Sequence, residues 1–297
     1  MVNTPFKMSQ PKPYAFKNYL SLVKFSHTIF AMPFALVGFF LAIQFDNYDF
    51  SWKLFVLVLL CMVFARNSAM SFNRVTDRFI DKRNPRTSSR EIPSGIIHPR
   101  HAFIFTVINA ILFITTTLFI NKLVFYLSPI ALIVILGYSY TKQFTVLCHF
   151  VLGVGLALAP IGAYLAVSGS WSYIPILFST IVFLWVSGFD ILYSLQDEEF
   201  DKEEALRSIP AVYGAVNARI ISALIHTAAT FFVIKAGILM ETGYLYWIGA
   251  LAFILLLIAQ HIIIKPNSAH RINLAFATLN SFASMVYALF IILSLYY

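Results

Sequence analysis

Long apolar runs, separated by short polar segments, make up most of this chain. Nine of them approach the roughly 20 residues that a helix needs to cross a bilayer. They cover approximately residues 20–44, 53–72, 102–120, 123–140, 147–168, 172–195, 217–238, 244–263 and 273–295. Apolar residues follow one another continuously within each run, which argues against an outer-membrane barrel. The pattern therefore predicts an all-α, polytopic membrane protein with nine transmembrane helices.

The composition supports a single membrane-embedded domain. Of the 297 residues, 60% are hydrophobic and only 11% are charged, whereas about 25% of residues are charged in a typical soluble domain. The nine runs leave little room for a separate soluble domain. We therefore expect a short cytoplasmic tail over residues 1–19 and one transmembrane domain over residues 20–297.

The basic residues predict the orientation of the helices. If the N-terminus lies inside and nine spans alternate, all Lys and Arg residues except Lys53, Lys122 and Lys235 fall on or near the cytoplasmic side. This is the positive-inside asymmetry, and a bacterial inner membrane is the expected location. The net charge of +8 thus reflects the basic residues expected on the cytoplasmic side. We expect the lipid bilayer as the partner of the basic surface, with no nucleic acid and no obligate protein partner.

Carboxylates gather in two short segments at the ends of apolar runs, although the chain has only 13 Asp and Glu residues. The segment after the second span contains Asn73, Asp77 and Asp81, and the segment after the sixth span contains Asp190, Tyr193, Asp197 and Asp201. Both follow an even-numbered span, so both are expected on the cytoplasmic side. Ordinary solvated helix ends are the alternative. Asp190 argues against them, because it follows the apolar residues 182–189 and should lie below the headgroups.

Helical spacing would place the acidic residues of each segment on one face, provided that each helix is continuous. The two faces could then meet across a central cavity, beneath a polar cap on the cytoplasmic side. Oxygen ligands of this kind suit Mg²⁺, or Mn²⁺ in its place, and Mg²⁺ in turn holds diphosphates. The expected metal ligands are Asn73, Asp77, Asp81, Asp197 and Asp201.

The two segments resemble the paired signatures of the UbiA superfamily of intramembrane prenyltransferases. The motifs are N-x-x-x-D-x-x-x-D at residues 73–81 and D-x-x-Y-x-x-x-D-x-x-x-D at residues 190–201. Further similarities are Arg86-Thr87, Arg90-x-x-Pro93-Ser94-Gly95, Tyr138-x-Tyr140-Thr141-Lys142 and Arg207-Ser208. The chain departs from the family pattern at Arg74, where Asp is frequent, at Glu91, where Pro is common, and at Ala205, where Gly is common.

The resemblance implies an enzyme that transfers a polyprenyl group from polyprenyl diphosphate to an aromatic ring, in ubiquinone or menaquinone biosynthesis. The expected catalytic residues are Asp77, Asp190, Tyr193 and Asp197. Asp190 would activate the acceptor hydroxyl, although it could instead ligate the metal. Phosphate oxygens are expected to bind Arg86, Arg90, Lys142, Lys202 and Arg207. The allylic cation would be stabilised by the rings of Tyr138, Tyr140 and Tyr193.

The acceptor is the least defined part of this interpretation. Residues 24–27, Lys-Phe-Ser-His, replace a stretch that the family associates with the acceptor. Lys24 could pair with the carboxylate of a hydroxylated aromatic acid such as 4-hydroxybenzoate, and His27 could bind its hydroxyl, although an interfacial lysine can also simply snorkel. A hydroxynaphthoate, a haem or another acceptor would use the same chemistry. A cation or metabolite transporter is the non-enzymatic alternative, but it predicts ionisable residues at mid-membrane.

Overall fold

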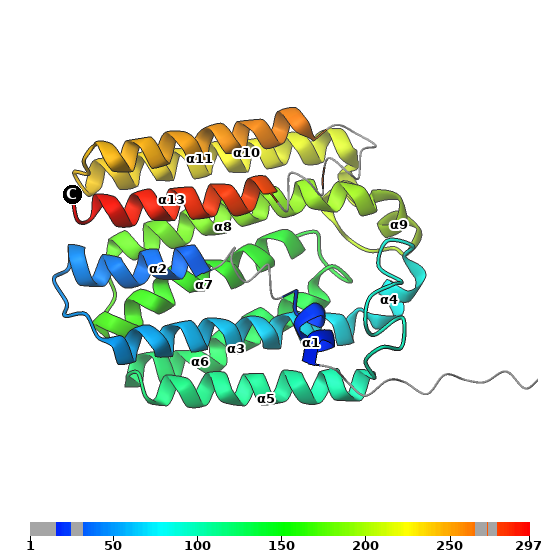
Figure 1. Ribbon diagram of the computed structural model, residues 1–297. Coiled ribbons are helices and arrows are strands. Elements are labelled where there is room, and N and C mark those ends of the chain that lie inside the picture. Colours follow the sequence, from blue (N-terminus) through cyan, green and yellow to red (C-terminus); the bar gives the residue numbers. More distant parts are fainter. Residues whose placement is uncertain (1–15, 25–31, 265–271, 273–277) are drawn as a thin grey trace, which may run out of the picture.

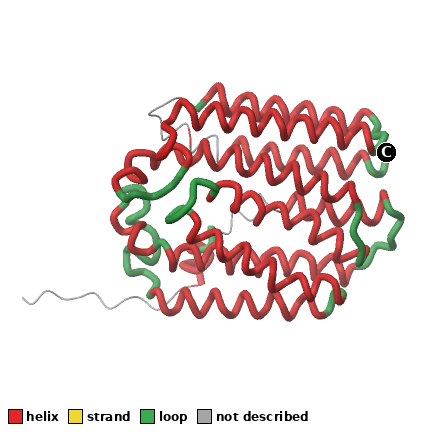
Figure 2. Tube along the Cα trace, turned by 180° about the vertical axis from the view of Figure 1, so that it is seen from behind, coloured by secondary structure: helices red, strands yellow, loops and turns green. Residues whose placement is uncertain are grey.

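The computed structural model describes residues 16–24, 32–264, 272 and 278–297. The described residues form helices and loops without a strand (Figure 2). Seven helices are long and apolar enough to span a membrane. They are α3 (Trp52–Thr76), α5 (Pro99–Leu118), α6 (Lys122–Thr141), α7 (Cys148–Ser168), α8 (Tyr173–Ser194), α10 (Ile209–Leu239) and α11 (Tyr244–Ile263).

Two further apolar helices are shorter than a membrane span within the described residues. The first is α2 (Met32–Phe40), which continues as a π-helix over Leu41–Phe45, and the other is α13 (Asn280–Ser294). They coincide with the first and last of the nine predicted spans. Seven predicted spans are thus confirmed as helices of spanning length, and the total of nine stays a prediction. Most of the predicted tail lies outside the described residues, although α1 (Phe16–Leu22) begins within it.

Local signals in the sequence explain where several helices begin and end. The side chains of Ser51, Asn121 and Ser208 each accept a hydrogen bond from a backbone N–H in the first turn of the helix that follows. Such caps satisfy donors that have no partner within the helix. At its other end α7 stops at Gly169, whose φ of 65° is a left-handed conformation that glycine adopts without strain.

The helices lie side by side and form a bundle (Figure 1). Helix α3 packs against α5 and α6, α7 packs against α2, α6 and α8, and α8 packs against α10. Helix α13 packs against α11 and α2. Large buried side chains fill the region between α2, α8, α11 and α13, among them Phe34, Trp185, Phe253 and Tyr287.

Glycines permit the closest helix contacts. At Gly38 in α2, a β-carbon would lie 1.9 Å from the backbone oxygen of Pro160 in α7. At Gly153 in α7, a β-carbon would lie 2.3 Å from the Oγ of Ser187 in α8. Small residues of this kind let membrane helices approach backbone to backbone. They hold α2 and α8 tightly against α7, which lies in the middle of the bundle.

Both acidic segments lie at the same end of the bundle, where they form a cap (Figure 1). The first segment continues from α3 into α4 (Arg78–Arg83), and the second continues from α8 through a 3₁₀ turn, Leu195–Asp197, into α9 (Glu198–Glu203). Neither motif lies on one continuous helix, so the condition for a single acidic face is not met. The backbone of Asp77 leaves the helical conformation (ψ 1°) between α3 and α4, and the 3₁₀ turn interrupts the second motif.

Candidate active site

A cavity of about 900 Å³ opens between α3, α6, α7, α8 and the cap. Most of the residues that the motifs predicted for a site contribute to its wall. They are Lys24, Asn73, Asp77, Asp81, Arg86, Arg90, Tyr138, Lys142, Asp190, Tyr193, Asp197 and Asp201. The structure thus brings side chains from residues 24 to 201 to one place, at the cap end of the bundle.

The carboxylates of the first motif are buried beside basic side chains. Asp77 is 3% exposed and Asp81 is 4% exposed. The ammonium group of Lys142 lies 3.4 Å from Oδ2 of Asp77, and Arg90 donates to Oδ1 of Asp81 at 2.7 Å. Asn73 also donates to Oδ2 of Asp77, at 3.1 Å. Charge pairing of this kind offsets part of the large cost of burying a carboxylate.

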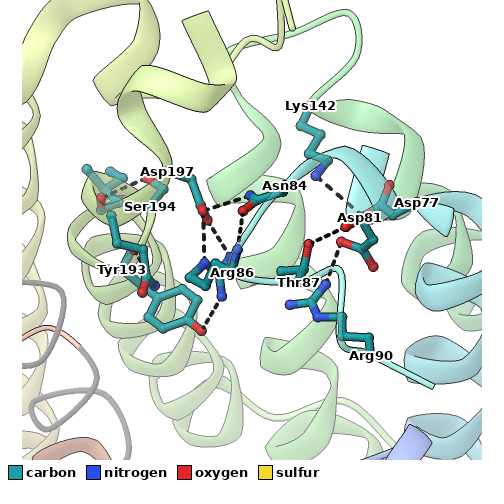
Figure 3. A network of polar contacts seen from close by, with 12 residues as sticks. Asp77, Asp81, Asn84, Arg86, Thr87, Arg90, Lys142, Tyr193, Ser194 and Asp197 are labelled. Atoms are coloured by element: carbon teal, nitrogen blue, oxygen red, sulfur yellow. Dashed lines mark hydrogen bonds and ion pairs between the residues drawn. The ribbon is translucent and has the colours of Figure 1, made fainter. Parts of the chain in front are cut away.

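A second group of contacts links the loop after α4 to the second motif (Figure 3). The Nε of Arg86, in the loop after α4, donates to Oδ1 of Asp197 at 2.9 Å. Asn84 donates to the same oxygen at 3.1 Å. The Arg86 guanidinium also donates to the Tyr193 hydroxyl at 3.3 Å and lies over its ring, 5.7 Å from the centroid. One arginine therefore contacts two residues of the second motif.

Two buried carboxylate oxygens, Oδ1 of Asp77 and Oδ2 of Asp81, have no hydrogen-bond partner in the part of the chain that the structure describes. Burial raises the pKa of the Asp77 carboxyl above its usual range, and the positive charge of Lys142 opposes this shift. Unpaired buried acceptors are costly, and hard divalent cations bind such oxygens. The donor set therefore fits Mg²⁺ or a similar ion. Among the described residues, however, no three His, Cys, Asp or Glu side chains lie close enough to share one ion.

That last observation differs from the prediction of one ion held jointly by both motifs. The side chains of Arg86, Arg90 and Lys142 lie against the carboxylates and neutralise them. In this arrangement the first motif has unpaired oxygens, whereas both oxygens of Asp197 accept hydrogen bonds from Arg86. The fit to a metal therefore depends mainly on Asp77 and Asp81.

Three predicted residues do not contribute to the cavity wall. Tyr140 is 47% exposed on the outside of α6, where its ring packs against Phe72. Lys202 forms an ion pair with Glu198 one turn away on α9. The exposed Arg207 lies between α9 and α10, and its backbone N–H donates to the Lys142 carbonyl. We therefore omit all three from the proposed site. His27 lies outside the described residues.

The sequence interpretation missed several polar residues of the cavity wall, namely Arg66, Arg74, Asn84 and His149. Arg66 and Arg74 both belong to α3, and the Nε atom of each is buried without a hydrogen-bond partner among the described residues. Arg66 had a signal in the sequence, because an ionisable residue inside an apolar span is usually functional. No sequence signal marks His149 or Asn84, because their roles depend on contacts with residues that are far away along the chain.

Away from the cap, the wall of the cavity becomes apolar. Its lining there includes Val58 and Met62 of α3, Val124 and Leu127 of α6, and Leu156 of α7. Asp77 and Val58 are 19 residues apart along the chain, which corresponds to about 28 Å of helix. The cavity therefore combines a charged end with a long apolar body.

Comparison with known proteins identifies this arrangement. The model of the UbiA prenyltransferase family matches residues 31–286. A 4-hydroxybenzoate octaprenyltransferase of Vesicomyosocius okutanii is 30% identical, with 82% of this chain and 88% of that protein covered. The apo structure of a UbiA homologue from Aeropyrum pernix K1 is 29% identical, with a TM-score of 0.81 over 90% of this chain and 98% of that one.

A more distant structure has the same fold. It is a UbiA homologue from Archaeoglobus fulgidus bound to GPP and Mg²⁺, with 22% identity, a TM-score of 0.73 and coverage of 93% of this chain and 99% of that one. The family match spans most of the chain, and seven apolar helices place it in a membrane. The chain belongs to the UbiA prenyltransferase family and is an integral membrane prenyltransferase.

Proposed function

We propose that this enzyme transfers a polyprenyl group from polyprenyl diphosphate to a hydroxylated aromatic acid, in quinone biosynthesis. The observation that carries the proposal is the polarity of the cavity, which has buried carboxylates and basic residues at one end and an apolar body below them. A lipid diphosphate has the same two parts. The name of the Vesicomyosocius relative supports a 4-hydroxybenzoate-like acceptor and a long prenyl chain.

Basic residues at the cap are placed to bind the diphosphate. Arg86, Arg90 and Lys142 would exchange their present carboxylate partners for phosphate oxygens. Asp77 and Asp81 would hold the divalent cation, with Asn73, Asp197 and Asp201 nearby in the same wall. When bound, that cation neutralises charge on the diphosphate as its bond to carbon breaks. The Mg²⁺ found with the Archaeoglobus homologue supports this choice of metal.

Aromatic side chains beside the carboxylates would stabilise the allylic cation. Tyr138 and Tyr193 both line the cavity near the carboxylates. The position of Arg86 over the Tyr193 ring indicates that this face accepts a positive charge. A cation over an aromatic face is stabilised by up to about 2 kcal/mol when water is excluded. The prenyl tail would extend along the apolar wall towards Val58.

The acceptor acid would bind beside basic side chains of the wall that form no ion pair with another described residue. Lys24, next to α1, lines the cavity, and so does Arg66 two turns below Asn73 on α3. Either could pair with the acceptor carboxylate. A hydroxynaphthoate would satisfy the same contacts as a hydroxybenzoate. The proposal therefore includes both acids.

Asp190 would act as the base. Its carboxylate takes the proton of the acceptor hydroxyl, and the resulting phenolate directs electrons to the ring carbon that forms the new C–C bond. The bond between the prenyl carbon and the diphosphate breaks, and its electron pair leaves with the diphosphate. The ring carbon then loses its proton to water, and Asp190 returns its proton to the phenolate oxygen, so that one proton is released in each turnover.

The topology proposed for the site follows from charge. We infer that the cap, the N-terminus and the diphosphate site lie on the cytoplasmic side of a bacterial inner membrane, because basic residues flank the cap. The bilayer would supply the prenyl substrate laterally.

Transfer assays with purified protein test this proposal. The protein receives a polyprenyl diphosphate and, in turn, hydroxybenzoate, hydroxynaphthoate and homogentisate. We expect prenylation of at least one acid and a loss of about 100-fold or more in Asp77→Asn and Asp197→Asn, because Asp77 would hold the divalent cation and Asp197 holds Arg86 beside the diphosphate site. Asp49→Asn is the matched control, since Asp49 is exposed in the loop before α3, away from the cavity wall. Failure with every acceptor, or full rates in both Asp variants, would refute the proposal.

A further inference from the structure

We propose that His149 is a positioning residue that orients the Asp190 carboxylate and directs one of its oxygens to the acceptor proton. This inference rests on the proposed function, in which Asp190 is the base. His149 is the second residue of α7, and Asp190 lies near the end of α8. Both side chains line the cavity.

The contact between the two residues is short and partly buried. Nδ1 of His149 lies 2.7 Å from Oδ2 of Asp190. The His149 side chain is 3% exposed, whereas that of Asp190 is 22% exposed. The imidazole therefore lies behind the carboxylate, which keeps access to the cavity. This arrangement suits a role in which His149 acts on the substrate only through Asp190.

A third helix determines which nitrogen of His149 carries the proton. The backbone N–H of Ile209 donates to Nε2 of His149 at 3.2 Å. Ile209 is the first residue of α10, so its N–H has no carbonyl partner within its own helix. An N–H donor requires a lone pair on Nε2. His149 is therefore neutral, with its proton on Nδ1, and it donates to Asp190.

This tautomer has a consequence for the reaction. Because Oδ2 of Asp190 accepts from His149, that oxygen carries no proton, and Oδ1 is the oxygen available to the acceptor hydroxyl. The proton moves from the hydroxyl to Oδ1 and later returns to the phenolate oxygen, while the Nδ1 proton stays on His149 throughout. The imidazole thus fixes the carboxylate in place without entering the proton balance.

The neutral partner also distinguishes Asp190 from the other carboxylates of the wall. Asp77, Asp81 and Asp197 each face a lysine or an arginine. A lysine or an arginine pairs its charge with the carboxylate that it contacts. The single imidazole donor to Oδ2 instead holds the orientation of Asp190 and leaves Oδ1 to the acceptor hydroxyl. The cavity wall thus contains three carboxylates that are suited to pairing with cations and one, Asp190, that is suited to accepting a proton.

Three variants at position 149 separate this role from a purely structural one. In His149→Asn, the amide nitrogen lies near the position of Nδ1 and keeps the donor to Asp190, but Ile209 loses its partner. In His149→Gln, the longer amide reaches the position of Nε2 and keeps a partner for Ile209, but Asp190 loses its donor. His149→Leu removes both contacts.

We expect the turnover number and the melting temperature to rank the three variants differently. The turnover number should fall at least about tenfold in His149→Gln and His149→Leu and clearly less in His149→Asn, within the range known for positioned proton transfer. The KM values for both substrates should change less than about twofold. The melting temperature should instead be better preserved in His149→Gln than in His149→Asn, because only His149→Gln supplies a partner for the start of α10.

The result that overturns the inference is a turnover number that follows the melting temperature, with His149→Gln more active than His149→Asn. Unchanged turnover in all three variants would overturn it as well. A wild-type protein that prenylates no aromatic acid would instead count against the proposed function. Measured binding of polyprenyl diphosphate, unchanged in the three variants, confirms that the charged end of the cavity is intact.

Discussion

Single residues in the cavity wall have distinct electrostatic environments, and these environments differ in what they can bind. Asp77 and Asp81 are buried and each keeps one unpaired oxygen, so they are suited to a cation. Arg66 and Arg74 are the reverse case, because each has a buried Nε without an acceptor. Buried unpaired groups are costly unless a ligand satisfies them. The cavity wall is therefore complementary to ligands that include both a cation and an anionic group.

The acceptor carboxylate can be tested at Lys24. We expect Lys24→Ala to raise the KM for the aromatic acid by roughly tenfold or more, because a hydrogen bond between charged groups contributes about 1.5–3 kcal/mol. The KM for polyprenyl diphosphate should stay the same. Steady-state kinetics with each substrate varied in turn measures both values.

Two controls make the Lys24 result specific. Lys17→Ala removes the same charge from an exposed position on α1, outside the cavity wall, and should behave as wild type. An acceptor analogue without the carboxylate should bind wild type and Lys24→Ala equally well. A KM for the acid that does not change in Lys24→Ala would assign carboxylate binding to another residue, with Arg66 the next candidate.

Most of the residues that the motif spacing predicted for a site line one cavity at the cap. Arg86 contacts Asp197 although 111 residues separate them along the chain, and both motifs follow even-numbered predicted spans. The partners of each side chain could not be predicted. The contact between His149 and Asp190 depends on how α7 packs against α8, and the orientation of the imidazole depends on the start of α10.

At the scale of the helix, the sequence predicted where apolar helices lie better than where a helix is interrupted. Apolar periodicity continues through the end of α3, so the bend at Asp77 had no signal in the hydrophobic pattern. The same holds for the 3₁₀ turn at Leu195–Asp197. Both breaks turn polar residues into the cap. An ion pair between Arg83, at the end of α4, and Glu204, directly after α9, links the two segments that follow these breaks.

Close helix packing yields a stability prediction at Gly38. We expect Gly38→Ala to destabilise the fold by about 1–3 kcal/mol, the usual cost of overpacking, because the added carbon meets the backbone oxygen of Pro160, which cannot rotate away. Thermal unfolding in detergent measures the effect. Gly137→Ala, in α6, is the control: nothing lies within 4 Å of its new carbon, and alanine favours the helix by up to about 1 kcal/mol. Equal melting temperatures for the two variants would contradict the packing argument.

At the scale of the whole molecule, the cap joins the two halves of the chain. Helices α3 and α4 supply Asp77 and Asp81, and α8 with the 3₁₀ turn supplies Asp190 and Asp197. Arg86 connects the halves through Asp197. A ligand that binds between them would therefore stabilise the bundle as a whole, because it binds the folded state and not the unfolded chain.

Removal and return of the divalent cation test this linkage. We expect prenyl transfer to stop in excess chelator and to return with added Mg²⁺. We also expect Mg²⁺ with polyprenyl diphosphate to raise the melting temperature of the wild type, since a ligand at 100 times its dissociation constant adds about 2.7 kcal/mol to the free energy of unfolding. In Asp77→Asn this rise should be largely lost, because the variant lacks a charged ligand for the cation, whereas Asp49→Asn should keep it. Full activity in chelator, or an equal rise in Asp77→Asn, would show that the buried carboxylates of α3 and α4 bind no metal that the reaction needs.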